Sequence, residues 1–236
     1  MPSSAVRIEQ HGANAVPEAE RNKSWWDLFV IWAGINIALS SFLVGGMLVP
    51  ALSFSAACWA HIIGNLLLAA LMALMGYMGV DYGISASVAS RFSLGHPKGA
   101  WLSSLCIIVS LTGWFAVTAE LSGLAIDELL KSLTGFSSPT LIIVLVGISK
   151  AATAIIGFEC IKWLSRLSVP LLLGLCGWLL LAIGEKYDLS ELIRYEPTGE
   201  MTFTAALDLV VGALIVGVFI SSDISRYVRS RSDNWR

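Results

Sequence analysis

The chain has 236 residues, of which 56% are hydrophobic and only 14% are charged, and its formal net charge is −2. A soluble domain of this length needs more charged surface, so the composition excludes an ordinary soluble globular protein. It indicates a polytopic membrane protein, and the near-neutral charge gives no support for a nucleic-acid partner.

The polar segment 1–24 comes first, and we expect it to be a disordered cytoplasmic tail without the apolar core of a signal peptide. Six apolar runs follow, each near the roughly 20 residues that cross a bilayer core. They predict an all-α transmembrane domain over 25–226, with spans at about 26–49, 54–78, 100–124, 140–159, 166–184 and 203–224. A short connection around 159–166 is expected between the fourth and fifth spans, and residues 227–236 are expected to form a basic cytoplasmic end.

The Lys and Arg residues that flank these runs predict the orientation in the membrane. Eleven of them, including Arg91 and Lys98, fall on one side, and three fall on the other. The larger group marks the cytoplasmic side, so both termini are expected in the cytoplasm and the protein in the cell (inner) membrane.

The fifteenth basic residue, Lys150, lies inside the fourth predicted span. A central Lys opposes insertion by about 2.5–3.5 kcal/mol. One reading is an ion pair with Asp208 or Glu120. The other, which we favour, is a side chain that snorkels or faces a wet cavity.

Metal chemistry and catalysis find little support in the sequence. The four Cys and three His have no metal-ligand spacing, so no metal site is expected. No paired carboxylates or His cluster share a plausible face, so an intramembrane enzyme is not expected either.

Two runs carry residues that weaken a helix in lipid. The first span contains GINIALSSFLVGG over 34–46, and the sixth contains DLVVGALIVGVFISSD with Gly212 and Gly217 in its middle. Such residues can mark discontinuous helices whose open backbone meets a transported solute. They can equally mark close packing between helices through small side chains, which is also the favoured reading of Asn65 in the second span. The sequence leaves both readings open.

Several short motifs carry a family resemblance. They are Gly64-Asn65-Leu66-Leu67-Leu68, Gly76-Tyr77, Arg91-Phe92-Ser93 with Gly95, and Gly113-Trp114-Phe115. In order and spacing they resemble the nucleobase:cation symporter-1 family, and its cytosine permeases in particular, over nearly the whole chain. The resemblance implies a twelve-span transporter on a five-plus-five inverted repeat with spans 1 and 6 broken, of which this chain holds the first six. It also implies a cation-coupled permease that moves a nucleobase or related planar heterocycle, such as cytosine, by alternating access.

The resemblance assigns roles within the first and third spans. The backbone carbonyls of Gly34 and Ile37 would face the coupling cation, and Ala38 would border the substrate. Trp114 would stack on the flat substrate, an interaction worth ~1–3 kcal/mol per base where it has been measured. Sodium and proton remain equal candidates for the cation, because the family's span-8 ligands are absent. No other cofactor is expected.

The chain departs from the cytosine permeases at other substrate positions. Leu111 stands where they carry a Gln, Ala213-Leu214 where they carry Ser-Phe, and Val216 where they carry a Ser. The pocket loses hydrogen-bonding groups and a second ring, so the exact substrate is open.

The family's spans 7 to 12 have no counterpart here. We expect a partial reading frame that does not transport by itself and for which a separate C-terminal half is a candidate partner. The alternative is a non-transporting membrane interaction protein or a pseudogene-like fragment.

Overall fold

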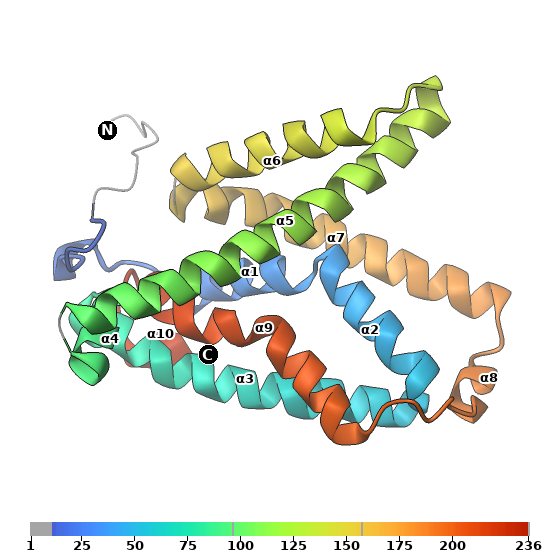
Figure 1. Ribbon diagram of the computed structural model, residues 1–236, viewed down its shortest axis with the longest axis horizontal. Helices are drawn as coiled ribbons and strands as arrows, with labels where there is room; N and C mark the ends of the chain where they lie inside the picture. The colour runs from blue at the N-terminus through green and yellow to red at the C-terminus, as the bar shows by residue number, and fades with distance from the viewer. Residues whose placement is uncertain (1–10, 96, 157, 236) are drawn as a thin grey trace. The chain divides into compact units, whose positions relative to one another are not determined.

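The computed structural model describes residues 11–95, 97–156 and 158–235, and the regular secondary structure in them is helical (Figure 1). A short 3-10 helix, Glu18–Glu20, precedes the helices. These are α1 (Trp25–Asn36), α2 (Leu39–Ala51), α3 (Phe54–Tyr82), α4 (Ala86–Leu94), α5 (Lys98–Thr134), α6 (Pro139–Ile156), α7 (Phe158–Lys186), α8 (Leu189–Arg194), α9 (Phe203–Ser225) and α10 (Arg231–Trp235).

Length and composition identify the helices that can cross a bilayer. Within the described ranges four qualify: α3, α5, α9 and the part of α7 from Trp163 to Lys186. A fifth is added if the bent pair α1 and α2 counts as one span, and α6 is an apolar but shorter helix. The connection expected around 159–166 falls within α7, which is helical from Phe158 onward, and the part of α7 that can cross a bilayer begins at Trp163.

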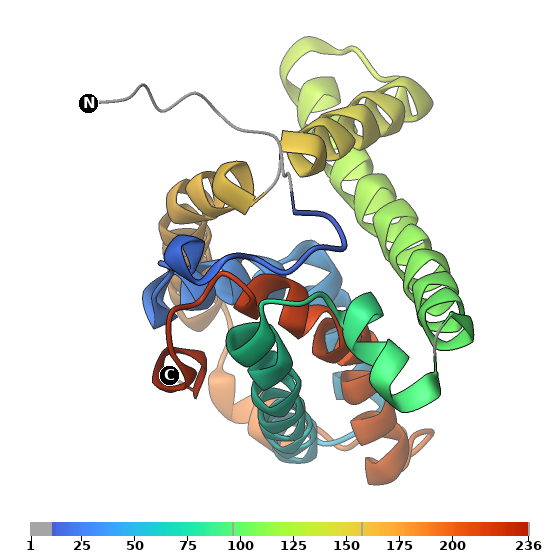
Figure 2. The same cartoon turned by 90° about the vertical axis from the view of Figure 1, so that its left-hand side faces the viewer.

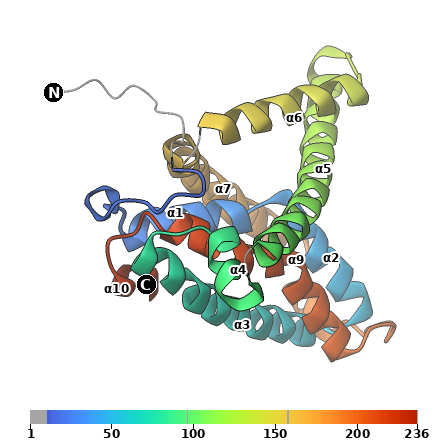
Figure 3. The ribbon, with the colours of Figure 1, turned by 60° about the vertical axis from the view of Figure 1, so that its left-hand side comes forward.

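The chain forms two compact units, each described by itself. The first holds residues 11–14 and 87–165 of the described chain, and its centre is the α5–α6 hairpin (Figure 3). A Cβ on Gly123 of α5 would lie 2.5 Å from Ile143 Cγ1, so the glycine allows the close approach of α6. The connection is fixed by Asp127, whose carboxylate accepts bonds from the Ser138 amide (2.7 Å) and the Ser137 hydroxyl (2.9 Å).

The second unit holds residues 15–86 and 166–235 of the described chain, and α3 and α9 lie side by side in it (Figures 1 and 2). Small residues bring the two helices together. A Cβ on Gly64 would lie 2.7 Å from Val210 Cγ1, and one on Gly79 would lie 2.5 Å from the Ser222 carbonyl oxygen. Larger side chains at these two positions would force the helices apart.

The N-terminal segment is ordered where the structure describes it, so the expected disorder is wrong for residues 11–24. Val16 is fully buried, and its amide donates to the Gly83 carbonyl (2.9 Å). Arg21 donates to the carbonyls of Val16 (3.0 Å) and Val80 (2.9 Å). A cationic side chain at the C-terminal carbonyls of α3 interacts favourably with the negative end of the helix dipole. The polar composition of residues 11–24 did not reveal this contact.

Candidate functional site

The first predicted span is interrupted at its middle, as expected. α1 ends at Asn36 and α2 begins at Leu39, with the two helices bent by 57°. Between them, Ala38 has the extended angles φ −126° and ψ 155°, and Ile37 has φ −85° and ψ 68°. The polypeptide therefore leaves the helical hydrogen-bond ladder for two residues.

Local hydrogen bonds accompany the end of α1. The Asn36 side chain donates to the Trp32 carbonyl (2.9 Å), and the Ile37 amide closes the last turn on the Ala33 carbonyl (2.8 Å). The Ser41 amide, the helical donor to Ile37, donates instead to the Ala38 carbonyl (2.9 Å). The break therefore removes the helical partner of the Ile37 carbonyl, as unwound backbone at a cation site requires. The cation role of Gly34 and Ile37 stays a prediction.

The expected interruption of the sixth span is wrong. α9 is one continuous helix from Phe203 to Ser225, and Figure 1 shows it bending along its length without a gap. Gly217 serves close packing, because a Cβ there would lie 2.8 Å from Met72 Cε and 3.4 Å from Trp32 Cζ3. Of the two readings of these glycines, helix packing is the one that Gly217 follows.

A pocket of about 610 Å³ opens within the second unit, between α1, α3, α9 and α10. Its lining combines aromatic rings with three carboxamides and includes Trp25, Trp32, Asn36, Asn65, Leu214, Asn234 and Trp235. Asn65 donates to the His61 carbonyl one turn away in its own helix (2.9 Å), so this bond lies within α3 and does not join two helices. Aromatic faces with a few amide groups suit a planar, partly polar ligand.

Of the predicted substrate residues, Leu214 lines this pocket. Ala213 and Val216 are half-buried in the continuous α9 and are not among its lining residues. Ala38 lies at the break after α1 and is also half-buried.

Trp114 and Leu111 lie on α5, in the first unit. Trp114 is half-buried and Leu111 is 39% exposed. Because the break and α9 belong to the second unit, the expectation that these two side chains face them stays a prediction.

The pocket also contains residues that the sequence analysis did not select. Trp25 and Trp32 lie with Asn36 on one face of α1, at spacings of seven and four residues. This helical periodicity is visible in the sequence and could have indicated a shared face. Their partners on α3 and α9 could not be found in this way, since helix pairing is not encoded in the spacing.

Lys150 makes neutral contacts within the first unit. Its ammonium donates to the Thr118 carbonyl (2.7 Å) and to the Ser122 hydroxyl (3.1 Å) of α5. Among the described residues, no ion pair joins it to Glu120. Asp208, the other proposed partner, belongs to the second unit. Hydrogen bonds to neutral groups therefore help offset the cost of a charge at this depth.

The sequence matches, over residues 15–236, the family described as permeases for cytosine/purines, uracil, thiamine and allantoin. The chain belongs to this permease family. It is 31% identical over 216 residues to the cytosine permease of Escherichia coli (strain K12), an alignment that covers 91% of this chain and 50% of the relative. It is 28% identical to the hydantoin permease of Microbacterium maritypicum, covering 87% of this chain and 42% of the relative. The chain thus spans about half the length of these curated relatives.

Solved structures support the same fold. The chain superposes with a TM-score of 0.84 and 24% identity on Mhp1, a nucleobase-cation-symport-1 family transporter in a closed conformation with bromovinylhydantoin bound. The match covers 98% of this chain and 52% of Mhp1. The inward-facing conformation of Mhp1 gives a TM-score of 0.77. The chain therefore has the helical fold of one half of this transporter.

Proposed function

We propose that this permease chain supplies the first six spans of a cation-coupled secondary transporter for a nucleobase or related planar heterocycle. The observation that carries the proposal is the break at Ile37 and Ala38, in the middle of an otherwise apolar span. Unwound backbone in a bilayer requires protein or a water-filled cavity around it, and in transporters such breaks form solute and ion sites. Moving a solute through this site makes the protein a transporter rather than an enzyme.

The substrate class follows from aromatic and small residues. Stacking on Trp114 suits a flat ring, and Ala38 allows the backbone to approach the ligand. Leu111, Ala213 and Val216 supply apolar contacts where the cytosine permeases offer polar groups, and Leu214 stands where they offer a second ring. We therefore place the substrate among planar heterocycles that need fewer hydrogen bonds from these positions than cytosine does.

Coupling would use the backbone carbonyls of Gly34 and Ile37 as oxygen ligands for sodium, or as part of a proton-linked site. The excess of Lys and Arg on one side of the spans supports cytoplasmic termini in the cell membrane. Because the relatives are twice as long, we propose that transport requires a complement equivalent to their other half, and a separate chain is one candidate.

Uptake into proteoliposomes tests the proposal. One set of vesicles holds this chain alone, and another holds it with the second half of the Escherichia coli cytosine permease. We expect saturable, cation-gradient-dependent uptake of radiolabelled cytosine, uracil, a purine or hydantoin in the paired vesicles only. Uptake by the chain alone would refute the need for a complement. If the two halves purify together but neither bind nor transport any of the four compounds, the proposal that the chain is part of a transporter is refuted.

Trp114 gives a sharper test in the paired vesicles. Trp114→Ala should weaken substrate binding by roughly 1–3 kcal/mol through lost stacking. Trp178→Ala is the matched control, because Trp178 is an exposed tryptophan on α7. Equal losses in both variants would make Trp114 a packing residue.

A further inference from the structure

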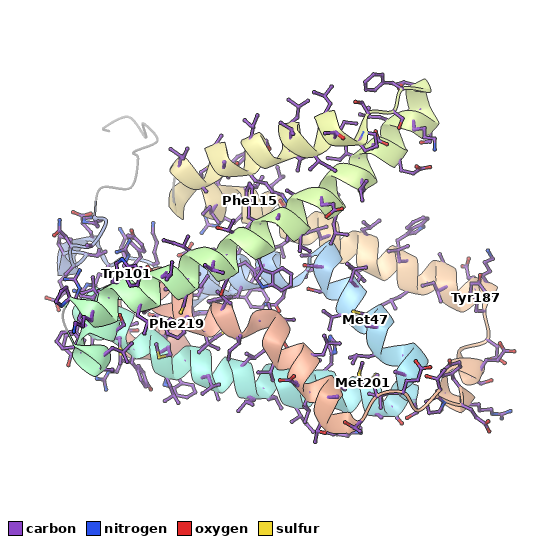
Figure 4. The ribbon with its side chains drawn as sticks, in the orientation of Figure 1. Met47, Trp101, Phe115, Tyr187, Met201 and Phe219 are labelled. Carbon is purple, nitrogen blue, oxygen red and sulfur yellow. The ribbon has the colours of Figure 1, made fainter. Side chains whose placement is uncertain are left out.

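The corner between α4 and α5 presents apolar side chains outward in the first unit. Phe92 is 82% exposed and Trp101 is 70% exposed, and Leu94 and Leu102 are exposed beside them. Figure 4 shows Trp101 on the part of α5 that lies next to α4. The corner follows α3 and precedes α5, two helices that can each cross the bilayer, so it lies at a membrane boundary. Aromatic side chains concentrate at that depth.

Short-range contacts fix the shape of this corner. Gly95 turns the chain with φ +80°, and the Gly99 amide donates to its carbonyl (2.7 Å). The hydroxyls of Ser90 on α4 and Ser103 on α5 lie 2.6 Å apart in a hydrogen bond. A Cβ on Gly99 would lie 2.5 Å from the Leu94 Cβ, so α4 packs closely on the start of α5. The side chains at the corner are thus carried by a rigid support.

The corner has positive charge without a matching negative charge. Arg91 and Lys98 lie within a stretch, residues 82–119, that contains no Asp or Glu. In the part of the chain that the structure describes, neither residue forms an ion pair, and the Arg91 Nε is buried without a hydrogen-bond acceptor. Since a guanidinium is always charged, a buried donor of this kind favours an anion close by.

We propose that the α4–α5 corner binds the headgroup of an anionic phospholipid, with Arg91 and Lys98 at the phosphate and Phe92 and Trp101 at the level of the glycerol and upper acyl chain. The charge is complementary to phosphatidylglycerol and similar lipids, to which each Lys or Arg near the surface adds attraction. A guanidinium matches the oxygens of a phosphate diester. The exposed apolar side chains beside the cations distinguish a lipid from a soluble anion, because a soluble anion leaves them without a partner. This inference does not rest on transport.

Native mass spectrometry of the full chain in a neutral detergent tests the proposal. The protein is titrated with phosphatidylglycerol, with phosphatidylcholine of the same acyl chains and with glycerol phosphate. We expect phosphatidylglycerol to bind at least fivefold more tightly than phosphatidylcholine. Arg91→Gln and Lys98→Gln should each reduce this preference about fivefold, whereas Arg91→Lys should keep part of it.

Two controls decide between outcomes. Lys131→Gln removes an exposed Lys from the other end of α5, where it pairs with Glu128, and should leave the preference unchanged. Phe92→Ser should weaken the binding of both lipids and leave the binding of glycerol phosphate unchanged. Any of three results would overturn the proposal. They are equal affinity for the two lipids, a loss of preference in Lys131→Gln as large as in the corner variants, and binding of glycerol phosphate as tight as that of phosphatidylglycerol. Because Lys98 is exposed, Lys98→Gln should fold, and its lipid preference can be measured even if Arg91→Gln does not fold.

Discussion

The first span and α9 present similar sequence signals and have different backbones. Both are apolar runs with glycines near the middle, yet the first is broken at Ile37 and Ala38 while α9 is continuous from Phe203 to Ser225. The first run also holds Asn36, whose side chain takes the Trp32 carbonyl as its acceptor. The middle of α9 has no such polar side chain between Val210 and Phe219.

Neither glycine nor the Asn36 bond is enough by itself to end a helix, because Asn65 makes the same bond one turn back inside the continuous α3. Glycine permits a break but also permits close packing, and neighbours decide between the two. Along α9 the neighbours are α3 residues such as Met72, which occupies the space beside Gly217. At the first span, side-chain competition for backbone groups accompanies the end of α1.

Proline substitution should separate the two spans by the largest effect. Ala213→Pro removes an amide donor inside the continuous α9 and should lower the free energy of unfolding by ~3 kcal/mol or more. Leu39→Pro falls at the first position of α2, and Ala38 before it has the extended conformation that a residue preceding proline prefers. Its free energy of unfolding should therefore equal that of Leu39→Ala. Unfolding by SDS in mixed micelles measures both. A Leu39→Pro loss as large as that of Ala213→Pro would mean that the helix runs through the break.

Substitution of glycine by alanine should give the next largest changes in the free energy of unfolding, with opposite signs at Gly79 and Gly212. A Cβ on Gly79 would lie 2.5 Å from the Ser222 carbonyl oxygen and 2.8 Å from the Arg226 nitrogen, which are backbone atoms of the chain it faces. Gly79→Ala should therefore destabilise the protein by ~1–3 kcal/mol through overpacking. Gly212 in α9 has open space, so Gly212→Ala should stabilise by up to ~1 kcal/mol through helix propensity. Losses of equal size in the same assay would mean that Gly212 is needed for a local break.

Composition and short motifs predict the helical class and the family, and the resemblance to that family implies the break within the first span. The sequence does not predict the continuity of α9, since that depends on which helix packs beside Gly217. Nor does it predict the order of residues 11–24, because Arg21 meets the end of α3 across about 60 residues of chain. Of the pocket, Leu214 was selected through resemblance, whereas Trp32 and Asn65 required the pairing of α1, α3 and α9 to be known.

The starts of the two spans differ in a way that charge substitutions can show. At α1, one oxygen of Asp27 accepts from the Ser24 amide (3.1 Å) and the other pairs with Arg166 of α7 (2.6 Å). At α9, the Thr202 hydroxyl accepts from the Ala205 amide (3.2 Å). Asp27→Ala and Thr202→Ala should each destabilise by ~1 kcal/mol.

Asp27→Asn distinguishes the two parts of the Asp27 contact, because an amide oxygen can still accept the cap bond. It should lose only the share due to Arg166, and that share should shrink as salt is raised. The Thr202→Ala loss should not depend on salt. A salt-independent loss in Asp27→Asn would mean that the Arg166 pair contributes nothing measurable.

The smallest effect is a pH dependence confined to the start of α1. The Ser230 hydroxyl (2.6 Å) lowers the pKa of Asp233, assisted by Arg229 and by the Trp25 amide at the first residue of α1. The native state therefore binds this proton more weakly than the unfolded chain, whose Asp titrates near pH ~3.9. The stabilisation is fully present above that pH and is lost as the pH falls below it. Asp233→Asn should accordingly lower the melting temperature at pH 6, and the difference from the unmodified chain should narrow below pH ~4. Thr202→Ala removes an uncharged cap from α9, so its melting temperature should lie below that of the unmodified chain by the same amount at both pH values. If that difference also narrowed below pH ~4, the pH effect would belong to the whole molecule and not to Asp233.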